Sequence, residues 1–253
     1  MINPDMAIRL GIAALYAVLL AVYLNAEKKN DGKTGFRKAM AIKLTLSGIF
    51  CATGILCYWE YVSVGVFGVG YVPPQLFILL GLFAAFAGDY FLQYIKLNEK
   101  KYIAGICCFA AAQVLFITAL ILHSNSYILN SDNSYLMDWI LSVIITVVVL
   151  LCVLAMMKKQ RWRLGGEKNV ITVYTVLLTF MTAKAVSSLT VQTSPGWTLF
   201  AAGAVLFLIS DMLLGIWNYH TGKRVHANLN WISYYAGMLL IAFSTSDIYI
   251  HFI

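Results

Sequence analysis

Charged side chains are scarce in this sequence. Asp, Glu, Lys and Arg make up 11% of its 253 residues, and 61% are hydrophobic, whereas a soluble globular domain carries about 25% charged residues. So small a charged fraction excludes an ordinary soluble domain. Collagen-like, Gln/Asn-rich and Ser/Pro-rich tracts are missing as well, so no part of the chain has the composition of a fibrous or low-complexity segment.

Long apolar runs dominate instead. A bilayer core about 30 Å thick needs roughly 20 apolar residues per helix. The first run lacks a preceding basic segment and a small-residue cleavage site, so we expect a retained helix rather than a signal peptide. The runs predict an all-α polytopic membrane protein that forms a single transmembrane domain over residues 1–253. Its eight predicted spans are 6–25, 40–57, 75–95, 102–122, 138–157, 170–189, 197–218 and 231–250.

Basic residues are missing from every second connection between these spans. Fifteen of the eighteen Lys and Arg lie in the four remaining connections, at 26–39, 96–101, 158–169 and 219–230. Because basic loops stay on the cytoplasmic side, both termini are expected outside. The net charge of +7 therefore indicates topology and attraction to anionic membrane lipids rather than nucleic-acid binding.

Several catalytic signatures are absent. The four histidines lie in loops or near the C-terminus, without the Cys or acidic neighbours of a zinc site. No G-x-S-x-G elbow and no Gly-rich phosphate loop occurs. The five cysteines form no C-x-x-C pair, so we expect buried free thiols. We therefore expect neither a metal nor a cofactor.

Two aspartates stand inside apolar runs. Asp89 and Asp211 each follow a glycine by eight residues and precede a leucine by three. A carboxylate at membrane depth is costly unless paired, hydrated or protonated, so each marks a functional site by default. Their helices are each third in a set of four, which predicts a parallel four-plus-four helix repeat about an axis along the membrane normal. Such an axis would bring both aspartates to one central cavity near the cytoplasmic side.

The residues alone leave three interpretations open. Two carboxylates in one apolar pocket cannot both ionise cheaply, so an acid and a base would stand side by side. That pair suits hydrolysis through an oxocarbenium ion, or proton- or cation-coupled transport, or a purely structural role. Lys184 lies deep in its span and could serve structure or function, whereas the span 138–157 is expected to face lipid.

The sequence resembles the YhhN/TMEM86 family of integral membrane proteins, whose characterised members are lysoplasmalogenases. The resemblance spans nearly the whole chain. The motifs that carry it are Lys43, Gly88-Asp89 with Leu92, Gly105-x3-Phe109, Tyr174, Met181, Gly203-x3-Phe207-x2-Ser210-Asp211, and Tyr234-Tyr235 with Leu239-Leu240-Ile241-Ala242.

The resemblance implies hydrolysis of the vinyl ether bond of lysoplasmalogens to a fatty aldehyde and glycerophospho-ethanolamine or -choline. It implies Asp89 and Asp211 as catalytic residues, in undecided roles. The substrate would enter from the bilayer and contact Lys43, Gln113, Tyr174, Ser210, Tyr234 and Tyr235. The short loops favour a bacterial plasma membrane.

Two positions depart from the family pattern. Gln113 stands where the family usually has His, and Met238 stands where the family often has Gln. If that histidine moves a proton, its loss alters activity or substrate range. If it only hydrogen-bonds, Gln113 can replace it.

Overall fold

The computed structural model describes residues 4–28, 32–64, 72–93, 98–125, 134–160, 162, 166–190 and 193–246. Within them the chain forms eight α-helices: α1 Pro4–Lys28, α2 Gly32–Val64, α3 Pro74–Leu92, α4 Glu99–Asn125, α5 Ser134–Lys159, α6 Lys168–Ser187, α7 Pro195–Ile216 and α8 Arg224–Phe243. Short turns of other helix types follow three of them: η2 Ser188–Thr190, the π-helical η3 Trp217–Thr221, and η4 Ser244–Ser246.

The predicted all-α membrane architecture is confirmed. Seven of the described helices, α1 to α7, are long and apolar enough to cross a bilayer. The eighth, α8, falls outside this group because its first half is polar and includes Arg224, Asn228 and Asn230. The last predicted span was placed at 231–250, whose residues 247–250 lie outside the described residues.

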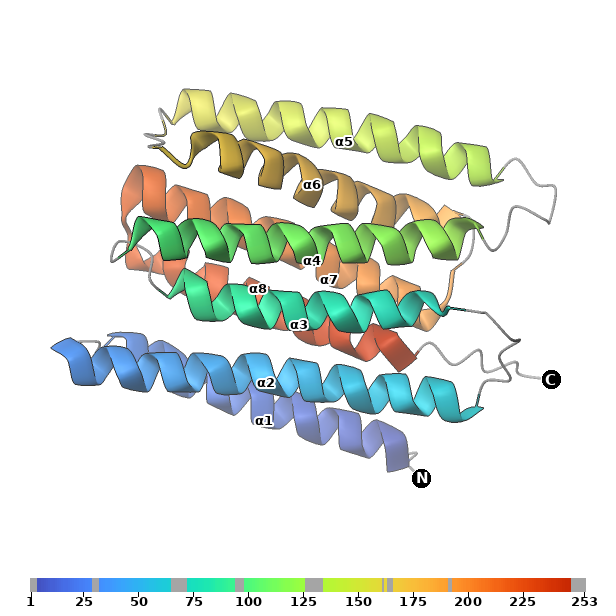
Figure 1. The fold of residues 1–253 in the computed structure, drawn as a ribbon, viewed down its shortest axis with the longest axis horizontal. Coiled ribbons are helices and arrows are strands. Elements are labelled where there is room, and N and C mark those ends of the chain that lie inside the picture. Colours follow the sequence, from blue (N-terminus) through green and yellow to red (C-terminus); the bar gives the residue numbers. More distant parts are fainter. Residues whose placement is uncertain are drawn as a thin grey trace.

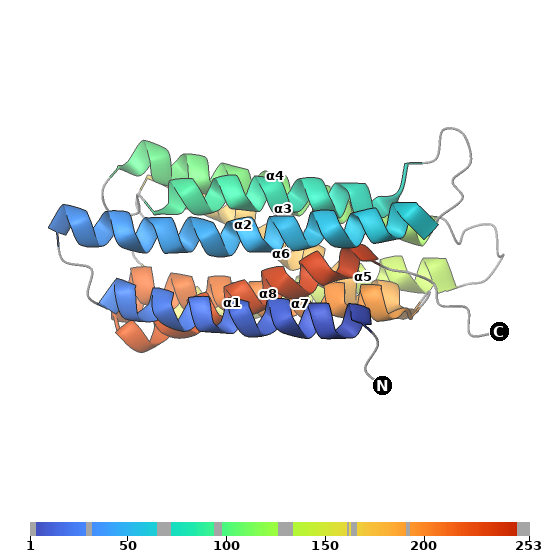
Figure 2. The same ribbon diagram turned by 90° about the horizontal axis from the view of Figure 1, so that it is seen from below.

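The helices alternate in direction and lie nearly parallel (Figure 1). The helix ends that flank the four basic connections gather at one end, on the left of Figure 1, and α1 begins and α8 ends at the other. Viewed from below, α2, α3 and α4 form a layer over α1, α8 and α7 (Figure 2). We call the end with the basic connections the basic end.

The packing pattern supports the predicted repeat. The two helix pairs that pack most extensively are α3 with α4 and α7 with α8, which occupy equivalent places in the two halves. Between the halves, α2 packs on α8, and α6 packs on α4. A rotation that exchanges α1–α4 with α5–α8 converts the α2–α8 contact into the α6–α4 contact, so a repeat predicts that both are present.

The glycine eight residues before each aspartate permits this pairing. A Cβ on Gly81 would lie 2.3 Å from the Phe116 ring of α4. A Cβ on Gly203 would lie 2.7 Å from the Gly237 carbonyl oxygen of α8. Small residues let membrane helices approach closely. Because each aspartate follows its glycine by eight residues, the close helix contact at the glycine sets where the carboxylate lies in the bundle.

We predict that Gly203→Ala lowers stability by about 1–3 kcal/mol, because the added methyl meets backbone that cannot move aside. The melting temperature in detergent measures this. Gly48→Ala is the matched control, since a Cβ there meets nothing within 4 Å. Equal melting temperatures for the two variants would contradict the close α7–α8 contact.

Helix α5 departs from the expectation of a purely lipid-facing span. Most of its apolar side chains are exposed, as predicted. At its start, however, Asp138 is fully buried and forms an ion pair with Lys184 of α6. Ser124 and Ser187 also donate to the Asp138 carboxylate, at 2.8 and 2.6 Å. A lysine buried in an apolar interior is costly unless it is paired. The Asp138 carboxylate is the partner that allows Lys184 to lie this deep in its span.

Lys184→Met should lower the free energy of unfolding by about 3–5 kcal/mol, because it leaves Asp138 buried and unpaired. Adding Asp138→Asn should recover much of that loss, since both charges are then gone. Thermal melting in detergent is the measurement, with Lys168→Met, an exposed lysine at the start of α6, as control. A double variant no more stable than Lys184→Met would contradict the pairing.

The cysteines follow the prediction only in part. Cys51 and Cys57 are buried free thiols, as expected. Cys107 and Cys152 are exposed instead, and Cys108 is half-buried. In a membrane protein an apolar side chain is as well solvated by lipid as by protein, so hydrophobicity alone does not bury it.

Candidate active site

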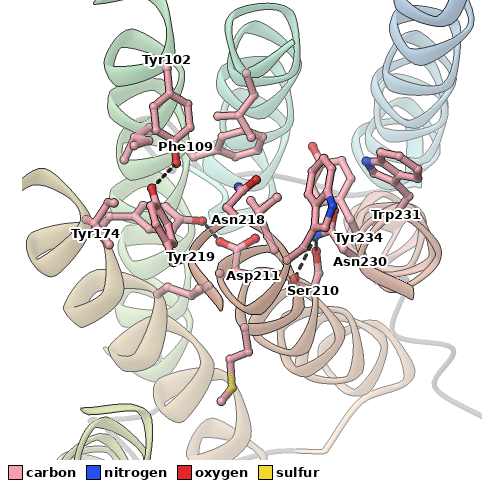
Figure 3. A pocket seen from close by; sticks show the side chains of 18 of the residues that line it. Tyr102, Phe109, Tyr174, Ser210, Asp211, Asn218, Tyr219, Asn230, Trp231 and Tyr234 are labelled. Carbon is pink, nitrogen blue, oxygen red and sulfur yellow. Dashed lines mark hydrogen bonds between the residues drawn. The ribbon is translucent and has the colours of Figure 1, made fainter. Parts of the chain in front are cut away.

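A cavity of about 390 Å³ lies inside the bundle, toward the basic end. Figure 3 shows side chains that line it. Asp89 from α3 and Asp211 from α7 both line this cavity, as the repeat predicted. Six of the eight sequence-predicted site residues line it: Lys43, Asp89, Tyr174, Ser210, Asp211 and Tyr234.

Asp89 is held by three polar partners. The Lys43 ammonium lies 3.2 Å from its Oδ1. The hydroxyls of Ser47 and Tyr234 donate to its Oδ2 at 2.6 and 2.7 Å. The side chain is only 2% exposed, so a cation and two hydroxyl donors replace water around a buried charge. Both carboxylate oxygens of Asp89 therefore have polar partners inside the bundle.

Asp211 has a different environment. Its Oδ2 accepts a hydrogen bond from the Tyr174 hydroxyl of α6. None of the ion pairs among the described residues involves Asp211. In Figure 3 its carboxyl group points into the cavity, between Tyr174 and Ser210. A carboxyl group that faces a cavity with no cationic partner among the described residues can act as a proton donor.

Two predicted site residues lie outside the cavity wall. The Tyr235 hydroxyl donates to the Lys43 backbone carbonyl at 3.4 Å, so Tyr235 contacts the helix that carries Lys43 rather than the cavity. Gln113 is fully buried on α4. Neither polar atom of its amide has a hydrogen-bond partner among the described residues, and Gln113 does not line the cavity.

Asn230 is a site residue that the sequence reasoning missed. Its Nδ2 donates to both the backbone oxygen and the hydroxyl of Ser210, each at 2.8 Å (Figure 3). This contact ties α8 to α7 directly beside Asp211. The available signal was helical spacing, because Asn230 lies four residues before Tyr234 on the same face of α8.

Aromatic side chains surround the cavity at the basic end. The hydroxyls of Tyr102 and Tyr219 lie 2.9 Å apart (Figure 3), and Tyr219 also donates to Glu167 at 3.3 Å. Trp162 stacks on the Tyr219 ring, with centroids 5.9 Å apart. A Cβ on Gly215 would lie 2.2 Å from Trp162, so glycine is required for this indole to pack on α7.

Part of the cavity lining is apolar. Helices α4 to α7 contribute its hydrocarbon wall: Ile106, Phe109, Val153, Met157, Ile171, Leu178, Leu208 and Met212. The cavity thus joins a polar centre with the two carboxylates to a surface suited to a hydrocarbon chain. Among the described residues, no three His, Cys, Asp or Glu side chains lie together as a metal site.

The fold and this cavity define a polytopic helical membrane protein with a two-carboxylate site inside the bundle. The sequence matches the YhhN family over residues 50–245. This chain therefore belongs to the YhhN family. Neither the curated proteins nor the solved structures contain a match.

Proposed function

We propose that this protein hydrolyses the vinyl ether bond of lysoplasmalogens and releases a fatty aldehyde and glycerophospho-ethanolamine or -choline. The observation that carries the proposal is the unequal pair of carboxylates in one cavity with an apolar wall. Membership of the YhhN family is consistent with it. The reaction needs one proton donor and one group that stabilises positive charge, and this pair offers both.

In the first step, Asp211 protonates the β-carbon of the vinyl ether, and the ether oxygen and α-carbon share the resulting positive charge. Asp89 carries the negative charge that stabilises this oxocarbenium ion. Water adds to the α-carbon, and Asp89 takes the proton that the water loses. The product is a hemiacetal.

In the second step, the hemiacetal collapses. Its hydroxyl proton returns to Asp211, the bond to the glycerol oxygen breaks, and Asp89 protonates that oxygen as it leaves. The aldehyde and the alcohol form, one water is consumed, and both carboxyl groups regain their starting states. No redox partner is needed.

The remaining residues support binding. Lys43 pairs with Asp89 and also attracts the substrate phosphate, while Tyr174, Tyr234 and Ser210 surround the polar group. The apolar wall holds the alkenyl chain, which enters from the bilayer. Tyr235 supports the helix that carries Lys43, and Gln113 lies outside the cavity wall. We place the protein in a bacterial plasma membrane with the cavity toward the cytoplasm.

Purified protein should release fatty aldehyde from lysoplasmalogen in the presence of a metal chelator. Asp211→Asn and Asp89→Asn should each lower kcat by about 10²–10⁴-fold, the usual contribution of a general acid or base. Glu60→Gln, whose ion pair with Arg9 lies outside the cavity, should match the wild type. A folded wild-type protein that releases no aldehyde would refute the proposal. If the protein instead transported a solute in proteoliposomes and this flux depended on a pH gradient, Asp89 and Asp211 would serve proton-coupled transport.

Tyr174→Phe should lower kcat by about tenfold, because removing one hydrogen bond to Asp211 costs about 1–1.5 kcal/mol. The aldehyde assay measures this, and KM should change less than kcat. Tyr135→Phe removes a hydroxyl bonded to Asn125 far from the cavity and controls for loss of a phenol group. Full activity in Tyr174→Phe would show that the hydroxyl does not position Asp211.

A further inference from the structure

Asn218 lines the cavity without a partner for its amide. Both polar atoms of its side chain are buried, and neither has a hydrogen-bond partner among the described residues. Figure 3 shows the amide above Asp211, in the space between Tyr219 and Tyr234. An unsatisfied buried polar group costs about 1–3 kcal/mol. Its presence in the wall of a cavity points to a ligand that completes the hydrogen bonds.

The local backbone explains how Asn218 reaches this position. It is the second residue of the π-helical turn η3, which closes with a hydrogen bond from the Gly222 N–H to the Trp217 carbonyl, at 3.0 Å. Gly222 ends the turn in the left-handed region, with a φ of 63°. Asn218 follows Asp211 by seven residues, two helical turns on the same face. Single π-helical turns are rare and frequently occur at functional sites.

The amide selects a particular ligand chemistry. Its NH₂ donates and its carbonyl accepts, so a hydroxyl group satisfies both sides at once. A phosphate group offers only acceptor oxygens and would leave the Asn218 carbonyl unpaired. An ester group likewise has no proton to give. The wall beside Asp211 is therefore built for a neutral hydroxyl.

We propose that Asn218 binds the free hydroxyl of the glycerol backbone next to the ether bond, and thereby selects the lyso form of the substrate over its 2-acylated form. This inference rests on the proposed function. The hydroxyl is borne by the carbon adjacent to the one that carries the ether oxygen, so an amide close to Asp211 can hold it while the vinyl ether meets the carboxyl group. Acylation of that hydroxyl removes the donor and adds bulk.

The test compares lysoplasmalogen with its 2-deoxy analogue, which lacks only that hydroxyl. We expect the wild type to lose about 10²-fold or more in kcat/KM on the deoxy analogue, because a site built for a hydroxyl is left unpaired without it. Asn218→Ala should process both compounds at nearly equal kcat/KM. Asn228→Ala is the matched control: its carbonyl oxygen is also unpartnered among the described residues, but Asn228 does not line the cavity. It should keep the wild-type preference.

A binding measurement separates this inference from the reaction itself. A 1-O-alkyl lysolipid, which has no vinyl bond, and its 2-deoxy counterpart are titrated into the protein in detergent. The wild type should bind the hydroxyl form more tightly, and Asn218→Ala should not distinguish the two. If this holds but no aldehyde is ever released, the proposed reaction fails and the Asn218 site stands. If Asn218→Ala keeps the wild-type preference in both assays, the inference is wrong.

Asn218→Leu provides a second variant of nearly equal size should Asn218→Ala not fold. It loses both the N–H donors and the carbonyl acceptor, so it should also lose the preference for the hydroxyl form. An unchanged preference in Asn218→Leu would likewise overturn the assignment.

Discussion

Two carboxylates have to be accommodated inside an apolar bundle, and contacts from five helices meet that requirement. Lys43 and Ser47 of α2 and Tyr234 of α8 converge on Asp89 of α3. Tyr174 of α6 reaches Asp211 of α7. An isolated buried charge is costly, and these contacts supply each carboxyl group with partners. The Tyr234–Asp89 contact also joins the two halves, and the two carboxyl groups are left in unequal surroundings around one cavity.

The Asp138–Lys184 pair shows how the same fold treats a carboxylate without access to the cavity. Asp138 has a cation from α6 and hydroxyl donors from α4 and α6, and neither Asp138 nor Lys184 lines the cavity. This pair attaches the otherwise lipid-exposed α5 to α6. Asp211 differs in that it faces the cavity with a single hydroxyl partner among the described residues, which is the arrangement expected of a group that exchanges a proton.

Much of the fold could be predicted from the sequence, because bilayer thickness and the distribution of basic residues strongly constrain the fold of a membrane protein. The spans, the alternating basic connections and the convergence of Asp89 and Asp211 followed from those constraints. Asp138 was missed because it stands at the edge of a run and its partner comes from another helix. Asn218 was missed because it is the last residue of the predicted span 197–218, although its spacing of seven residues from Asp211 places it on the same helix face.

In the proposed mechanism Asp211 donates the first proton, and Asp89 is the carboxylate that stabilises the positive charge. Infrared spectroscopy of the purified protein, compared in H₂O and D₂O, detects the carbonyl stretch of a protonated carboxyl group directly. We expect such a band at neutral pH, and we expect it to disappear in Asp211→Asn and to persist in Asp89→Asn. A band lost in Asp89→Asn and kept in Asp211→Asn, or no protonated carboxyl band in the wild type, would contradict it.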